Sequence, residues 1–165
     1  MITYEFANKT QLEIIAGLLK QSDLPSSDIE ESQVDFIVAW DDSKIFGCIG
    51  LEKFGTEGLL RSFAVDNTYR KRGYGKELYN RLLAFAVQNE ITTLHLLTDT
   101  AKEYFMKAGF SARNRSNAPE ILQGTKEFAS LCPSSSLYMV LENLSEHVLY
   151  IDQKLFKTRM DDSAF

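Results

Sequence analysis

Hydrophobic positions alternate with polar ones at the start of the chain and then change to a helical spacing. Residues 2–6 alternate as in a strand, and Asn8 stands where an N-cap residue would begin a helix that runs to about Lys20. The apolar residues of this helix fall on one stripe, formed by Leu12, Ile15 and Leu19. The polar segment 21–33 contains Pro25 and predicts a loop or short helix that could cover a substrate site. The pattern thus predicts a strand and an amphipathic helix at the start of the fold.

The next stretch predicts an antiparallel meander of strands at 34–40, 44–52 and 59–65. The strands are separated by two polar turns, Asp41-Asp42-Ser43 and Gly55-Thr56-Glu57-Gly58. If the second turn is a simple hairpin loop, Glu52 and Arg61 lie opposite each other on neighbouring strands, where opposite charges attract.

Helices and short strands alternate after the meander. The spacing predicts a helix from Gly75 to about Glu90 with Leu78, Leu82, Leu83 and Ala86 on its apolar side, and then a strand at 93–98. A right-handed crossover of this kind makes 59–65 and 93–98 parallel or splayed neighbours. Later elements are expected as a helix at 101–108 capped by Gly109, a helix within 118–131 and a strand at 136–141.

A basic loop punctuated by glycines follows the third strand of the meander. Gly73 and Gly75 carry no side chain where a ligand must approach the backbone, and the first amides of the following helix have no internal partner. Lys71, Arg72 and Lys76 add positive charge beside these amides. The loop is therefore predicted to bind a pyrophosphate or a similar group.

Other interpretations of this loop fit less well. A Walker A loop requires Gly-Lys-Ser/Thr, but Gly75-Lys76 is followed by Glu77, and position 70 is not glycine. A dinucleotide-binding fingerprint needs a third glycine or alanine where this chain has Leu78. The alternative without a ligand is a tight turn with solvated charges.

Composition and charge restrict the partners. A chain of 165 residues with 44% hydrophobic residues predicts one domain, and its formal net charge of -5 argues against a general nucleic-acid-binding protein. We find no membrane-spanning apolar stretch and no signal-peptide pattern, so we expect a cytoplasmic protein without a membrane partner. Cys48 and Cys132 lack metal-ligand spacing, so no metal site is expected, and buried inert thiols are favoured over nucleophiles.

Two motifs resemble the GCN5-related N-acetyltransferase (GNAT) superfamily. The run Arg70-Lys71-Arg72-Gly73-Tyr74-Gly75, preceded by a strand that ends Ala64-Val65-Asp66, resembles its acetyl-coenzyme-A loop, and 101–110 resembles its helix that ends in Gly-Phe. Further runs are similar to the arsenic-resistance-associated N-acetyltransferases, which are related to N-acetylglutamate synthase: Gly50-Leu51-Glu52, Leu59-Leu60-Arg61-Ser62, Arg115 with Ala118-Pro119, and 127–135. The resemblance covers residues 1–142, predicted as the acetyltransferase domain, and leaves 143–165 as an extension of unknown role with an amphipathic stretch at 148–156.

The resemblance implies an α/β fold with a mixed, mostly antiparallel central sheet, a V-shaped splay between the fourth and fifth strands, and flanking helices. It implies direct transfer of acetyl from acetyl-CoA to an amine through a tetrahedral intermediate. A small amine, an amino acid or a similar compound, is the expected acceptor, based on Arg61 and the subgroup. Acetylation of a protein or peptide and a non-catalytic acyl-CoA-binding module stay open as alternatives, and so does a homodimer.

The resemblance also implies roles for individual residues. Cofactor contacts are expected from Phe63, Ala64, Val65, Arg70, Lys71, Arg72, Gly73, Tyr74, Gly75, Lys76 and Phe105. The amide of Val65 is expected to polarise the thioester carbonyl, because fixed donors stabilise the negative charge that develops there. Arg70 either supports the loop or meets a phosphate.

An amine attacks only when neutral, so a base is expected. Glu52 is preferred over Glu57, which is expected in a turn, and His95 is interpreted as structural. Arg61 either pairs with Glu52 or clamps a substrate carboxylate. Arg115 is expected to reach the substrate or to act structurally.

The superfamily's usual general acid, a tyrosine, corresponds to Phe105 in this chain. Tyr104 lies one position earlier, about 100° around a helix, and is the first alternative for the proton that the leaving thiolate takes up. The other two alternatives are another hydroxyl, such as that of Tyr138, and a thiolate that leaves without a proton donor.

Overall fold

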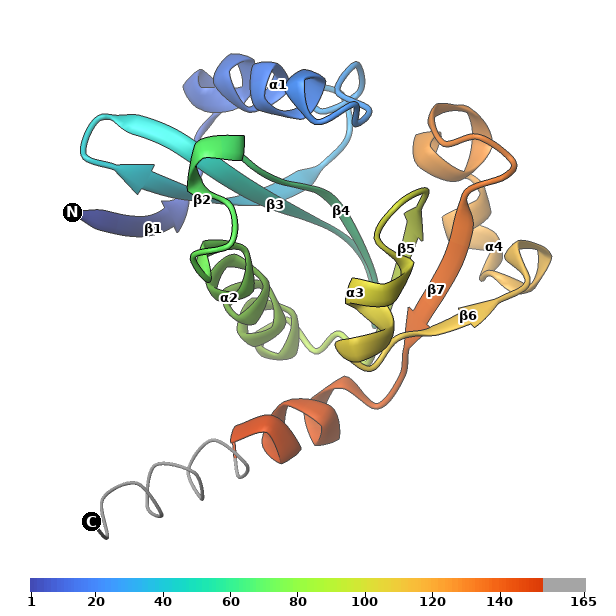
Figure 1. Cartoon of the computed structure of the whole chain (residues 1–165). Helices are drawn as coiled ribbons and strands as arrows, with labels where there is room; N and C mark the ends of the chain where they lie inside the picture. The colour runs from blue at the N-terminus through green and yellow to red at the C-terminus, as the bar shows by residue number, and fades with distance from the viewer. Residues whose placement is uncertain (153–165) are drawn as a thin grey trace, which may run out of the picture.

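A seven-stranded sheet runs through residues 1–152, the part of the chain that the computed structural model describes (Figure 1). Its strands are β1 (Ile2–Phe6), β2 (Val34–Asp41), β3 (Lys44–Phe54), β4 (Glu57–Val65), β5 (Thr93–Thr98), β6 (Ser111–Arg113) and β7 (Leu137–Leu141). The order across the sheet is β1-β2-β3-β4-β5-β7-β6. Within these residues β4 pairs with β5 in parallel and the other pairings are antiparallel, which confirms the predicted mixed sheet.

Helices cover both faces of the sheet. They are α1 (Leu12–Gln21), α2 (Tyr74–Gln88), α3 (Lys102–Lys107) and α4 (Glu120–Gln123), with the short turns η1 (Lys9–Gln11), η2 (Asn67–Tyr69), η3 (Arg115–Asn117) and η4 (Glu127–Leu131). Figure 1 shows α1 and α2 on opposite sides of β2, β3 and β4. The largest core lies between the sheet and α2 and α3, a second core lies under α1, and a third lies under the segment 118–128.

The predicted elements differ from the observed ones at several places. Asn8 begins η1 rather than α1, and its side chain and that of Gln11 form a capping box. In place of the single helix expected within 118–131, the structure has α4 and the π-helical turn η4, separated by residues 124–126. Strand β6 was not predicted, because three exposed residues carry no alternation of burial.

The hairpin between β3 and β4 is tighter than predicted. Phe54 pairs with Glu57, so the loop is only Gly55-Thr56, and Gly55 takes a φ of 63° that suits glycine. As a result Glu52 lies opposite Leu59, and Arg61 lies opposite Gly50. The predicted direct opposition of Glu52 and Arg61 is therefore wrong, because a shorter loop shifts the register of the whole pair.

The parallel pairing of β4 with β5 ends early. It runs from the pair Glu57–Thr93 to the pair Leu59–His95, and beyond Leu59 the two strands separate while β5 stays paired with β7. The predicted splay between the fourth and fifth strands is confirmed. The carboxyl-terminal half of β4 therefore borders β3 on one side and an open edge on the other.

The chain continues beyond β7 into a helix that begins at Leu144. Leu144 is fully buried in the largest core, and its N–H donates to the carbonyl of Thr92 at 3.0 Å. The domain boundary at 142 stays a prediction, and part of the amphipathic stretch 148–156 lies outside the described residues. Across residues 1–152, no helix has the length and apolar character needed to cross a bilayer.

Candidate active site

The basic loop folds back on itself just before α2. Lys71 has a φ of 63° and Gly73 a φ of 88°, so two left-handed positions lie within three residues and bend the loop. The first backbone hydrogen bond of α2 runs from the Glu77 N–H to the Gly73 carbonyl at 3.1 Å. The amides of residues 71–76 have no hydrogen-bond acceptor among the described residues, as an anion site requires.

Gly75 shows how a ligand would fit the loop. A Cβ atom added at Gly75 would meet its nearest atoms, on Phe63 and Val65, at 3.6 and 3.7 Å, which are ordinary contacts. The packing of the protein itself therefore does not demand glycine at this position. Glycine at this position leaves the backbone open to an approaching group, and with the charges of Lys71, Arg72 and Lys76 this is compatible with a bound diphosphate.

The main-chain groups of Val65 point toward the open edge of β4. The Asp66 N–H donates to the Phe46 carbonyl at 2.7 Å, so the main-chain groups of Asp66 point at β3. The direction of the main-chain groups alternates along an antiparallel strand. The main-chain groups of Val65 and Phe63 therefore point away from β3, and those of Ala64 point at β3. Arg70 confirms this direction, because its Nε donates to the Val65 carbonyl at 2.9 Å. That contact makes Arg70 a support of the loop, one of its two expected roles.

The aromatic residues of α3 separate into a buried and an exposed one. Phe105 is buried and packs edge-on against Phe110. Tyr104 is 42% exposed, and its ring centroid lies 6.1 Å from that of Phe63 on β4. The Tyr104 side chain thus lies beside the splayed part of β4, and burial raises the pKa of its hydroxyl.

Arg61 is surrounded by three buried carboxylates. Its Nη1 and Nη2 each donate to a different oxygen of Asp28 at 2.6 Å, and Nη1 also donates to Glu52 Oε1 at 2.7 Å. Its Nε lies 3.4 Å from Glu127 Oε1. We call these four residues the Arg61 cluster. Since the bidentate fork already holds Asp28, this geometry favours the scaffold interpretation of Arg61 over the substrate clamp.

The Arg61 cluster ties two covering segments to the sheet. Asp28 lies in the polar segment 21–33, and Glu127 lies in η4, so the arginine joins segments that are far apart in sequence. A second ion pair, between Lys126 and Glu31, links the same two segments. Sequence reasoning missed Asp28 and Glu127 as site residues, and no local pattern marks either one.

The carboxylates of the cluster have different pKa values for physical reasons. Burial raises the pKa of Glu127 to about 7; Arg61 opposes this, and Glu52 and Asp28 add to it. Burial also acts to raise the pKa of Asp28, but hydrogen bonds from Arg61 and Ser32 outweigh it, so the pKa is lowered. A buried carboxyl that titrates near neutral pH is a typical general base.

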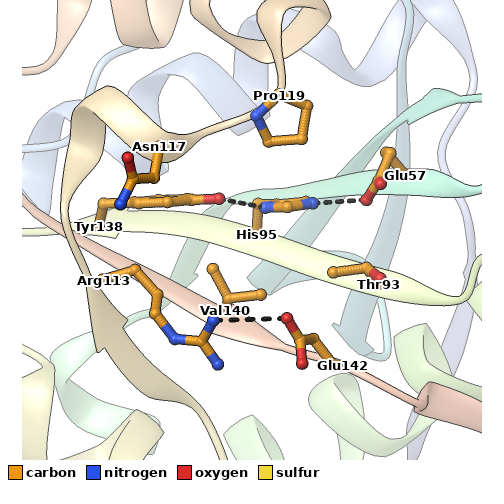
Figure 2. A pocket seen from close by; sticks show the side chains of 9 residues that line it. All are labelled: Glu57, Thr93, His95, Arg113, Asn117, Pro119, Tyr138, Val140 and Glu142. Carbon is orange, nitrogen blue, oxygen red and sulfur yellow. Dashed lines mark hydrogen bonds and ion pairs between the residues drawn. The ribbon is translucent and has the colours of Figure 1, made fainter.

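A second cluster lies on the other side of Leu59. It contains Glu57 and His95, which were weighed against Glu52 as the base, and Tyr138, which was weighed against Tyr104 as the acid. Figure 2 shows His95 in line between Glu57 and Tyr138. Nε2 of His95 lies 2.6 Å from Glu57 Oε2, and Nδ1 lies 2.6 Å from the Tyr138 hydroxyl. With a neutral imidazole, Nε2–H donates to the Glu57 carboxylate and the Tyr138 hydroxyl donates to Nδ1. We call this chain the His95 relay.

The His95 relay lines a pocket of about 240 Å³. The other lining residues are Thr93, Arg113, Asn117, Pro119, Val140 and Glu142 (Figure 2). Both nitrogens of His95 are occupied and the residue is 3% exposed, so its structural interpretation agrees with the geometry. Glu57 is the partly exposed end of the relay, with its side chain 30% exposed.

Arg115 and the two cysteines are engaged inside the protein. The guanidinium of Arg115 donates to the carbonyls of Pro133 at 2.6 Å and Phe128 at 2.7 Å, which stabilises the turn after η4. Burial raises the pKa of both Cys48 and Cys132 to about 12, so neither thiol is activated. Residues 1–152 contain no group of three or more His, Cys, Asp or Glu side chains arranged to hold a metal ion.

This sheet, splayed between β4 and β5 beside a glycine loop at the start of α2, is the acyl-CoA N-acyltransferase fold. Residues 32–112, which are 81 of the 165, match the family model described as "Acetyltransferase (GNAT) domain". Residues 32–112 are thus similar to a GNAT acetyltransferase domain, and the fold of the chain agrees with this match.

Solved structures support the same fold. The chain is similar to N-acetylglutamate synthase from Neisseria gonorrhoeae complexed with coenzyme A and N-acetyl-glutamate: the TM-score is 0.73 at 21% identity, over 87% of this chain and 35% of the synthase. It is also similar to Rv2747 from Mycobacterium tuberculosis in complex with CoA, with a TM-score of 0.69 at 21% identity over 85% and 98% of the two chains. Tetrahymena GCN5 matches with a TM-score of 0.69 at 16% identity over 86% and 96%. The chain thus spans about a third of the length of the synthase.

Proposed function

We propose that the protein transfers an acetyl group from acetyl-CoA directly to the amine of a small molecule, an amino acid or a similar compound. The observation that carries this proposal is the open edge of β4 next to the unpaired amides of the loop. The loop would hold the diphosphate of the cofactor. The open edge of β4 would offer the Val65 and Phe63 amides to the pantetheine arm and the thioester of the cofactor.

In the proposed mechanism the cofactor contacts are those expected from the sequence, and Glu127 is added as a residue for proton transfer. The backbone of 71–76 would bind the diphosphate, and the Val65 amide would stabilise the negative charge that develops on the thioester oxygen. Glu52 is the proposed base. Glu127 shares its cluster, and its pKa near 7 suits a group that accepts the amine proton near neutral pH. Tyr104 is the proposed proton donor to the thiolate.

The acceptor class is supported by the charge of the Arg61 cluster. Three carboxylates around one arginine leave an excess of negative charge when all are ionised, which favours an approaching ammonium group. A structural neighbour was crystallised with N-acetyl-glutamate, the product type expected for an amino-acid acceptor. Because Arg61 already holds Asp28, a substrate carboxylate would be bound by another group or only after Asp28 moves away.

Calorimetry with coenzyme A and an assay of thiol release with a panel of amines test the proposal. Binding with turnover on amino acids or similar amines is expected. Turnover only on peptides would favour the protein acetyltransferase alternative. Binding without turnover on any amine would favour the non-catalytic acyl-CoA-binding module, and absence of binding would refute the cofactor assignment itself.

Three finer expectations stay predictions. They are the resemblance to the arsenic-resistance-associated subgroup, a cytoplasmic location and a homodimer. Subcellular fractionation and light scattering would test the last two. An acceptor found with the amine panel would show whether the subgroup carries any biochemical meaning for this chain.

A further inference from the structure

The hydroxyl of Tyr79 on α2 is buried without a partner. Tyr79 is 5% exposed, and its hydroxyl oxygen finds no hydrogen-bond partner among residues 1–152. Leaving a buried hydroxyl unpaired costs free energy, so such a group in a native protein calls for an explanation.

Tyr79 lies next to the proposed cofactor groove. It follows Gly75 by four residues and therefore lies on the same stripe of α2, one turn further along. Gly75 faces Phe63 and Val65, the two residues of β4 whose main-chain groups point to the open edge. The ring of Tyr79 is 6.4 Å from that of Tyr104, which in turn lies 6.1 Å from that of Phe63. Three aromatic side chains, from β4, α2 and α3, thus meet beside the splay.

We propose that the Tyr79 hydroxyl donates a hydrogen bond to the pantetheine-thiol arm of coenzyme A. The inference rests on the proposed function, because it requires the arm to run along the open edge of β4. The hydroxyl oxygen is buried in the free protein, so a neighbouring side chain must move when the arm binds. Tyr79 is thus a positioning residue for the cofactor.

Donation without proton transfer agrees with the environment. Burial, and then the neighbouring Tyr104, raise the pKa of the Tyr79 hydroxyl. With a raised pKa the phenol stays neutral near pH 7 and can donate a hydrogen bond.

Replacing Tyr79 with phenylalanine tests the proposal with two ligands. Coenzyme A carries the arm, and adenosine 3′,5′-bisphosphate carries only the nucleotide end. In calorimetry, Tyr79→Phe is expected to weaken coenzyme A binding about fivefold, the value of one neutral hydrogen bond, and to leave binding of the bisphosphate unchanged. The free energy of unfolding should not fall, because the lost hydroxyl had no partner.

A matched control is Tyr150→Phe, which makes the same chemical change at a 63% exposed position outside the aromatic cluster. It should bind both ligands like the wild type. Equal coenzyme A affinity in Tyr79→Phe and wild type would overturn the inference while leaving the proposed function intact. An equal loss for both ligands, together with lower stability, would also overturn it, since that result indicates a structural hydroxyl. If the wild type binds neither ligand, both proposals fall.

Discussion

Replacing Glu127 with glutamine should change how the stability of the protein depends on pH. The carboxyl is 4% exposed, and burial raises its pKa to about 7 from the ordinary 4.5. The folded state therefore binds this proton more tightly than the unfolded state. Between pH 4.5 and 7 the wild-type protein loses the stability that this group contributes at low pH.

The magnitude follows from the two pKa values. Their difference, 7 minus 4.5, multiplied by about 1.36 kcal/mol per pH unit, gives a loss of about 3 kcal/mol. Glutamine has the same shape and never ionises, so Glu127→Gln escapes this loss. The variant should match the wild type near pH 4.5 and exceed its free energy of unfolding by up to about 3 kcal/mol at pH 8.

Urea unfolding of both proteins at half-unit steps from pH 4.5 to 8 measures this difference. Carboxyl groups outside the Arg61 cluster are present in both proteins, so their contributions largely cancel when the two curves are subtracted. The repulsion of Glu127 by Glu52 and Asp28 is already one of the causes of its raised pKa. A difference that stays flat across this range would refute the reasoning, because it would mean that Glu127 ionises at its ordinary pKa in the folded protein.

The remaining predictions concern the loop, the base and the Arg61 cluster. Gly75→Glu should abolish coenzyme A binding in calorimetry, because it places bulk and negative charge in the anion site; Gly17→Glu, where an added Cβ would meet nothing within 4 Å, is the control and should bind normally. Glu52→Gln should lower turnover most at low pH, where less of the amine is already neutral, and leave coenzyme A affinity nearly unchanged; wild-type rates at every pH would remove Glu52 from the mechanism. Arg61→Met should lower the free energy of unfolding by about 3–5 kcal/mol in urea titrations, because it leaves buried carboxylates without their cation; a loss below about 1 kcal/mol would show that the cluster contributes little.

Local features of the chain were predictable from the sequence. The amphipathic stripe of α1, the strands of the meander and the glycine loop before α2 each depend on residues close together in the chain, since periodicity and backbone preference act over a few residues. The splay also followed from the resemblance that the loop motif carries. The sequence by itself was therefore enough to propose residues 63–76 as the core of the cofactor site.

The partners of the charged side chains were decided only by the tertiary structure. Arg61 meets Asp28 and Glu127, which lie in covering segments far apart in the chain. The two-residue turn sets a register in which Glu52 lies opposite Leu59, and Glu52 reaches Arg61 from that position. Nor could the sequence show that Tyr79 would be buried without a partner among the described residues. Contacts between residues so far apart depend on how strands cross and loops close, and no spacing along the chain encodes that geometry.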